Sequence, residues 1–185
     1  MNRDAQYFIL CEDKQTQCFI RYFLAKHLIK REKIRCLKLP MQGAGEQYVR
    51  ENYPVELQKM RSKNFNNIVL LVCIDADIHS VADRYKELDD ECVKKKIPNR
   101  TNLESVAFFV PKRNIETWIE WLEDKEDVDE VALYPHRKKE SDCKPQAEKL
   151  ADMFIHNAGL STALPSIQAA QIEYNTRIGK GETLV

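Results

Sequence analysis

Acidic side chains follow two separate apolar segments of the chain, at the points where each segment ends. Glu12 and Asp13 come directly after one apolar segment, and Asp75 and Asp77 come after another. If both segments are neighbouring parallel strands, their carboxyl ends meet at the sheet edge where open α/β folds bind ligands. We therefore expect these carboxylates to converge in one crevice.

Crowded carboxylates repel one another, so they either take up protons or bind a divalent cation. Oxygen ligands favour Mg²⁺ or Mn²⁺, and Mg²⁺ often keeps waters and substrate phosphates as its other ligands. We expect Glu12, Asp75 and Asp77 to hold such an ion. Each strand end taken by itself has an alternative explanation. Glu12 and Asp13 could simply begin a helix, and Asp77 could cap the next helix.

A third group of polar residues follows a later apolar segment. Glu116 is a candidate for binding the metal or positioning a water, although an acid in the first turn of a helix capped by Asn114 needs no such role. Arg113 and Lys112 are candidates for contacting a scissile phosphate. Arg113 would be a bidentate hydrogen-bond donor, and Lys112 would act as a point charge. Solvated loop charges would explain the same two residues.

Basic residues gather in two parts of the chain. Lys138 and Lys139, with Arg137 and Lys144, form a cluster that could follow the backbone of a nucleic acid. Residues 21–38 contain seven basic side chains and one acid. A solvated surface is the alternative interpretation of both groups.

The elements that must position these residues alternate along the chain. Short apolar segments predict buried strands at residues 7–11, 34–39, 68–74 and 106–110. Helical periodicity separates them, and covers residues 20–28, 46–60, 81–92 and 114–122, the second weakened by Pro54. The alternation predicts a compact Rossmann-like α/β fold, with a parallel sheet of about four strands flanked by helices.

The length of 185 residues suits one domain with a small appendage. We expect an α/β domain over residues 1–124 and a helical extension over residues 125–185 that packs on the same domain. Within the extension, helices are predicted near residues 144–156 and 166–177, where Pro145 and Pro165 suit helix starts.

Composition narrows the class of protein. Lys plus Arg and Asp plus Glu are equal at 29 each, so no overall charge draws the chain to nucleic acid or membrane. The longest apolar stretch, residues 68–74, is far shorter than the roughly 20 residues that span a bilayer. We expect no membrane association, a cytoplasmic location, and free thiols at the six scattered cysteines.

The acidic strand ends resemble two motifs of the TOPRIM superfamily, over roughly residues 5–122. Its members carry a Glu at the end of the first strand and Asp-x-Asp at the end of the third, on a compact parallel α/β fold. The resemblance implies that Glu12 is a metal-linked acid or base, and that Asp75 and Asp77 are metal ligands.

Differences from the usual motifs, together with one further motif, narrow the resemblance to one group of TOPRIM proteins. Asp13 and Ser80 stand where many members have Gly, which argues against the topoisomerase and primase branches. Residues 111–118 (Pro-Lys-Arg-Asn-Ile-Glu-Thr-Trp) resemble a turn of divergent small TOPRIM-like nucleases of the OLD kind. Some of these proteins act in defence against phage, which implies a defence role here.

The leading functional expectation is Mg²⁺-dependent or Mn²⁺-dependent hydrolysis of phosphodiester bonds in DNA or RNA. Glu12, Asp75, Asp77 and Glu116 are its expected catalytic residues, and Lys112, Arg113, Lys138 and Lys139 are expected to contact substrate phosphates.

Two alternatives belong to other classes. One is a non-catalytic TOPRIM-like subunit of a larger ATPase or defence complex, or a homo-oligomer. The other is a phospho-acceptor receiver domain with Asp75 as acceptor, although the 63 residues that separate Glu12 from Asp75 exceed the usual interval.

Overall fold

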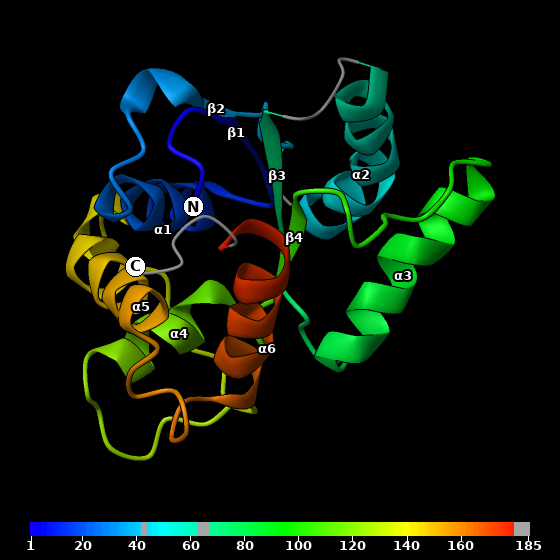
Figure 1. Ribbon diagram of the computed structural model, residues 1–185. Helices are drawn as coiled ribbons and strands as arrows, with labels where there is room; N and C mark the ends of the chain where they lie inside the picture. The colour runs from blue at the N-terminus through cyan, green and yellow to red at the C-terminus, as the bar shows by residue number, and fades with distance from the viewer. Residues whose placement is uncertain (42–43, 63–66, 180–185) are drawn as a thin grey trace.

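Among the residues that the structure describes, four parallel strands form one sheet that runs through the molecule (Figure 1). The computed structural model describes residues 1–41, 44–62 and 67–179. The strands are β1 (Gln6–Cys11), β2 (Ile34–Cys36), β3 (Ile68–Cys73) and β4 (Val106–Phe109). They lie in the order β2-β1-β3-β4. The predicted α/β fold with a parallel sheet is confirmed.

Both faces of the sheet are buried, which explains why its strands are almost continuously apolar. Successive side chains of a strand point to opposite faces. In β1, Tyr7 and Ile9 join the core on one face, whereas Phe8 and Leu10 contact the core on the other. The same alternation continues through β3 and β4, so β1, β3 and β4 each contribute to two separate cores.

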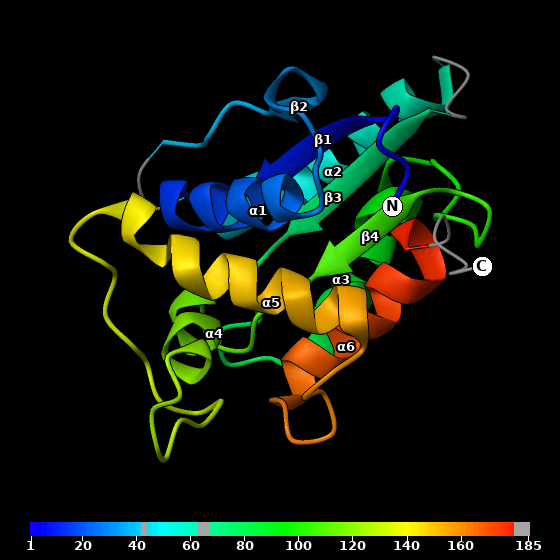
Figure 2. The same ribbon diagram turned by 60° about the vertical axis from the view of Figure 1, so that its left-hand side comes forward.

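Helices cover the two faces unequally (Figure 2). One face carries α1 (Lys14–Lys26), α4 (Ile115–Leu122), α5 (Lys144–His156) and α6 (Pro165–Glu173). The other face carries α2 (Gly45–Ser62) and α3 (Val81–Lys94). Short turns of other helix types are η1 (Arg31–Lys33), η2 (Glu140–Cys143) and the π-helical η3 (Tyr174–Ile178).

Two local predictions need correction. Pro54 does not interrupt its helix, because α2 runs through it. Pro54 is buried with its neighbours Tyr53 and Leu57, and this burial offsets the backbone hydrogen bond that a proline cannot donate. β2 ends at Cys36 rather than at residue 39, and its central Arg35 is exposed, as befits a short strand at the sheet edge.

The segment beyond residue 124 shares the larger core with the rest of the chain. Phe154 of α5 and Tyr174 of η3 pack edge-on against Phe23 of α1. α6 also covers the outer edge of β4, because the Glu173 carboxylate accepts a hydrogen bond from the Phe108 backbone N–H at 3.0 Å. A sheet edge that would otherwise be open is thereby capped.

All six cysteines are free thiols, as expected. Cys18 and Cys36 are partly exposed and the other four are buried. In the described part of the chain, no helix combines the length and the apolar character needed to cross a bilayer.

Candidate functional site

The strand order creates a crevice between the carboxyl ends of β1 and β3. From β1 the chain crosses to β2 on one side, and from β3 it crosses to β4 on the other. Such a reversal leaves an opening in which α/β proteins bind ligands. Cys11 and Cys73 are paired partners at the ends of the two strands, so the residues that follow them emerge side by side.

Glu12 and Asp75 meet at this opening. The backbone N–H of Asp75 donates a hydrogen bond to Glu12 Oε1 at 2.7 Å, although 63 residues separate the two in sequence. The Asp75 carboxylate accepts no hydrogen bond from any described residue and is only half-buried. The expected convergence of these two acidic residues is therefore observed.

Burial and mutual repulsion disfavour the ionised forms of the Glu12 and Asp75 carboxyl groups. Burial raises the pKa of Glu12 to about 7, and the charges of Asp77 and Asp13 add to the rise, against the hydrogen bond from Asp75. Burial, followed by the charge of Glu12, raises the pKa of Asp75 well above its usual range. A cation bound between them would relieve both effects.

Asp13 has a structural role. Its Oδ1 accepts a hydrogen bond from the Thr16 backbone N–H at 2.8 Å, which caps the N-terminus of α1. The helix-start alternative is thus correct for Asp13. Ser80, and not Asp77, caps α3, and it forms a reciprocal capping box with Asp83.

Asp77 lies at the rim of the crevice. Its backbone is left-handed, with a φ of 53°, and its side chain is 55% exposed. Its Oδ2 lies 3.5 Å from Nη2 of Arg84. The second acid of the Asp-x-Asp pair therefore points toward an internal arginine, while its charge still reaches Glu12.

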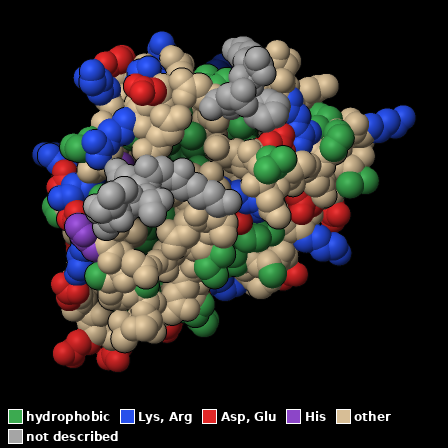
Figure 3. All heavy atoms as spheres, viewed as in Figure 1, with side chains coloured by type: hydrophobic (Ala, Val, Ile, Leu, Met, Phe, Trp, Pro, Cys, Tyr) green, Lys and Arg blue, Asp and Glu red, His purple; other side chains and the backbone are tan. Residues whose placement is uncertain are grey.

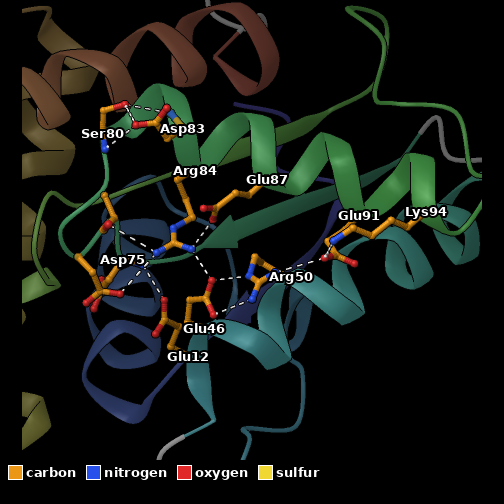
Figure 4. A network of polar contacts seen from close by, with 12 residues as sticks. Glu12, Glu46, Arg50, Asp75, Ser80, Asp83, Arg84, Glu87, Glu91 and Lys94 are labelled. Carbon is orange, nitrogen blue, oxygen red and sulfur yellow. Dashed lines mark hydrogen bonds and ion pairs between the residues drawn. The ribbon is translucent and has the colours of Figure 1, made fainter.

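That arginine was not anticipated. Arg84 of α3 is 2% exposed, and its Nη1 donates to Glu46 of α2 and to Glu87 of α3 (Figure 4). It also lies on the same helical stripe as the apolar residues Val81 and Leu88. A charge within an apolar stripe is the sequence signal that could have revealed a buried ion pair.

Glu46 connects this arginine to a second one. Arg50 binds both oxygens of Glu46 and reaches Glu91 Oε1 at 3.2 Å. Burial alone would raise the pKa of Glu46, but the hydrogen bonds of Arg50 and the charge of Arg84 outweigh it and lower the pKa. Glu46 is therefore a charged anchor for both guanidinium groups.

The start of α2 packs closely on Glu12. A Cβ atom at Gly45 would lie 2.8 Å from Glu12 Cβ and 3.0 Å from Glu12 Oε2. Real side chains do not approach so closely, so only glycine permits this packing. The first turn of α2 thereby fixes where the Glu12 side chain can lie.

Glu116 is buried at the start of α4 and bonded to a histidine that the sequence gave no reason to single out. Glu116 Oε1 lies 2.6 Å from His136 Nδ1, and Glu116 Oε2 is buried with no partner among the described residues. Burial raises the pKa of Glu116, and the nearby His136 opposes the rise. The charge of Glu116 also contributes to the raised pKa of Asp75, after burial and the charges of Glu12 and Asp13.

Arg113 and Lys112 border the loop that follows β3. Arg113 forms an isolated antiparallel bridge with Asp77, and its Nε is buried with no partner in the described chain. Lys112 donates from Nζ to the backbone carbonyl of His79. Arg113 retains an unused donor at the crevice, whereas the Lys112 ammonium already binds this loop.

The basic cluster near residue 138 divides into two kinds of side chain. Arg137 is bound to Glu120 and Glu123. Lys138 and Lys139 are exposed, and neither forms an ion pair with any residue that the structure describes. They precede η2, which is joined to α1 by a hydrogen bond from Gln15 to the Glu140 carbonyl. Their expected contact with phosphate remains a prediction.

The donor set suits a hard cation only if other ligands complete it. Across residues 1–41, 44–62 and 67–179, no group of three or more His, Cys, Asp or Glu side chains is placed to hold a metal ion. Mg²⁺ commonly takes one or two carboxylates together with waters and substrate phosphates. Glu12 and Asp75 provide the two carboxylates, whereas Glu116, bound to His136, does not join them as a third ligand within the described chain.

Comparisons with known proteins identify no relative, so a functional assignment rests on the geometry of the site. The chain matches no protein-family model, no curated protein and no solved structure. The resemblance to TOPRIM proteins accordingly remains a prediction based on its motifs.

Proposed function

We propose that the crevice between β1 and β3 hydrolyses phosphodiester bonds of nucleic acid with the help of Mg²⁺ or Mn²⁺. The observation that carries the proposal is the hydrogen bond from the Asp75 backbone N–H to Glu12 Oε1, which brings two acidic residues with raised pKa values together where the sheet order reverses. Unpaired acids in such a position need a cation, and phosphodiester hydrolysis is a reaction that a hard cation promotes.

Glu12 and Asp75 would hold the ion, with Asp77 free to turn toward it from the rim. When bound, the ion would neutralise charge on the phosphate and make a bound water more acidic. Asp77 has only the 3.5 Å contact with Arg84 to give up, and its side chain is already exposed.

The chain's own groups suit the remaining steps. Glu12 Oε2 accepts no hydrogen bond from the described residues, so this oxygen is available to take the proton of the attacking water. Arg113 is partly exposed and forms no ion pair with a described carboxylate, so its terminal guanidinium nitrogens would bind the phosphate oxygens as negative charge builds up. The water oxygen then bonds to phosphorus, the bond to the leaving oxygen breaks, and solvent protonates that oxygen.

Replacing Asp75 by Asn tests the proposal. The amide keeps the shape of the side chain but removes the negative charge, so we expect Mg²⁺-dependent cleavage of labelled DNA and RNA to fall by about 100-fold or more. Glu12→Gln should have a similar effect. Asp90→Asn is the matched control, because Asp90 is exposed on α3 and has no partner in the described chain.

The folded state of each variant is checked by circular dichroism and thermal unfolding. Full cleavage activity in a folded Asp75→Asn protein would overturn the proposal. A purified wild-type chain that cleaves neither DNA nor RNA at any Mg²⁺ or Mn²⁺ concentration would also overturn it, and would favour the non-catalytic subunit instead.

A further inference from the structure

A groove opens between α1 and the segment that forms η1 and β2. It consists of two adjoining hollows of about 190 and 530 Å³, which share Arg21, Arg31 and Ile34 among their lining residues. Cys18 lines the first hollow, and Arg35, Glu32 and Cys36 line the second. A water molecule occupies about 30 Å³ in the liquid, so each hollow has room for a hydrated anionic group.

Within the described chain, the arginines of this groove lack the carboxylate partners that five other arginines have. Arg21, Arg31 and Arg35 form no ion pair or side-chain hydrogen bond with any residue the structure describes. Elsewhere carboxylates bind the guanidinium groups of Arg50, Arg61, Arg84, Arg100 and Arg137. Unpaired guanidinium groups that share a hollow repel one another and are suited to bind phosphate oxygens.

The wider surface carries charges of both signs. Figure 3 shows Lys and Arg side chains, with some Asp and Glu among them, over the region where Figure 1 places α1 and η1. Glu32 is the carboxylate that lines the groove, and it forms no ion pair with another described residue. The arginine charges of the groove are therefore left largely uncompensated.

The groove leads toward the acidic crevice. Cys36 pairs with Ile9 of β1, three residues before Glu12, which is a distance of about 10 Å along a strand. Lys14, the first residue of α1, follows Glu12 by two residues, and its ammonium group donates a hydrogen bond to Gln17. Burial raises the pKa of the Cys18 and Cys36 thiols, and the charges of Lys14 and Arg21 oppose the rise at both. Positive charge thus continues from the groove to the start of α1.

We propose that this groove holds the sugar-phosphate backbone of a nucleic-acid strand whose scissile bond lies at Glu12 and Asp75. The proposal rests on the proposed function of that site. It explains why three unpaired arginines line a hollow that ends beside a site suited to phosphodiester chemistry. Because the contacts are to phosphates, binding should depend strongly on salt and little on sequence.

The first test measures binding without cleavage. A fluorescent single-stranded oligonucleotide is titrated with protein in EDTA at several salt concentrations, and anisotropy reports the affinity. Each lost phosphate contact to a single strand reduces the slope of log K against log salt by about 0.7, so Arg21→Gln with Arg31→Gln should reduce it by about 1.4. The matched control is Lys86→Gln with Lys96→Gln, which removes two exposed charges from and just beyond α3. An unchanged slope in the arginine variant would overturn the proposal.

The second test locates the strand by thiol protection. Cys18 and Cys36 are partly exposed and line the groove, whereas the other four cysteines are buried. A bound oligonucleotide should therefore slow alkylation of these two thiols by N-ethylmaleimide, as measured by mass spectrometry. Protection should disappear at high salt and in the double arginine variant, and it should persist in Asp75→Asn. Binding of the oligonucleotide with both thiols unprotected would place the strand elsewhere and overturn the proposal.

The two proposals fail in different ways. If groove variants bind normally while Asp75→Asn stops cleavage, the groove proposal falls and the catalytic one stands. If the arginine variant loses binding and protection while the wild-type chain cleaves nothing, the groove stands and the catalytic proposal falls. Vesicles containing anionic lipid are tested as an alternative ligand. Protection of the two thiols by these vesicles, without protection by the oligonucleotide, would overturn the proposal that the groove binds nucleic acid.

Discussion

At the scale of single residues, the carboxyl groups of the acidic crevice destabilise the folded state. Glu12 and Asp75 are brought together by a hydrogen bond, but burial and repulsion raise the pKa of each carboxyl group. In the unfolded chain both groups ionise at ordinary pH values. The folded protein therefore binds more protons than the unfolded one at neutral pH, and stability falls as pH rises.

Glu12→Gln should reveal this cost. A glutamine can still accept the hydrogen bond from Asp75, but it cannot become charged. Between the unfolded pKa near 4.5 and the folded value of about 7, the metal-free wild type should lose stability relative to the variant. The expected difference between pH 5 and pH 8 is about 1 to 3 kcal/mol in the free energy of unfolding, measured with urea in EDTA.

The matched control is Glu56→Gln, a change on α2 outside the crevice, which should give the same difference from wild type at both pH values. Adding Mg²⁺ at pH 8 should restore stability to the wild type more than to Glu12→Gln. A pH-independent difference between Glu12→Gln and wild type would contradict the assignment of the raised pKa.

At the scale of elements, the contact between the end of β1 and the start of α2 positions the site. Gly45 allows α2 to begin within van der Waals distance of Glu12, and a larger residue would collide with it. Two residues further along the chain from Glu12, α1 begins with its own cap at Asp13. The Glu12 side chain therefore lies between the starts of two helices.

Gly45→Ala should be destabilising, although the same exchange inside an exposed helix is usually stabilising by about 1 kcal/mol. The added Cβ would lie 2.8 Å from Glu12 Cβ, so either α2 or Glu12 must shift. We expect a net loss of about 1 to 2 kcal/mol in the free energy of unfolding, and a weaker apparent affinity for Mg²⁺ in the cleavage assay.

Gln47→Ala is the control for this change, because Gln47 is exposed in the first turn of α2 and its side chain donates a hydrogen bond to the exposed Glu51 on the same helix. An increase in stability for Gly45→Ala with unchanged Mg²⁺ dependence would show that the close approach has no importance for the site.

At the scale of the whole molecule, the C-terminal helices complete both the core and the sheet. Glu173 binds Arg100 and also accepts the hydrogen bond of the Phe108 backbone, so one carboxylate joins the end of α6 to β4. Arg100 in turn lies over the Phe108 ring, with its guanidinium carbon 3.4 Å from the ring centre. The α/β sheet and the helices after residue 124 are thus connected by a nearly buried ion pair.

Glu173→Gln should be costly because it leaves the Arg100 guanidinium, 9% exposed, without a negative partner. The expected loss is about 2 to 4 kcal/mol in the free energy of unfolding, since removing one member of a buried pair strands the other charge. Urea denaturation measures it, with Glu148→Gln as the control, because the Glu148 side chain on α5 is 38% exposed and its loss should change stability by less than about 0.5 kcal/mol. A loss as small as that of the control would mean that the pair does not couple α6 to the sheet.

Local signals in the sequence were sufficient for most of the fold. Apolar runs indicated the four strands, and the helix over residues 144–156 matches its predicted bounds. The positions of Glu12 and Asp75 followed from the same signals, because parallel strands bring their carboxyl ends to one edge. Pro54 was misjudged because the penalty for a proline is local, whereas the burial that offsets it is not.

Only the tertiary structure decided which charges face one another. Asp77 turns toward Arg84, and Glu116 binds His136; each contact joins residues from different parts of the chain. The arginines beside α1 likewise come from different elements and share one hollow. Periodicity and capping patterns record which face of an element is buried. The partner that a charged side chain finds depends on how those faces pack, and this information is spread over distant parts of the chain.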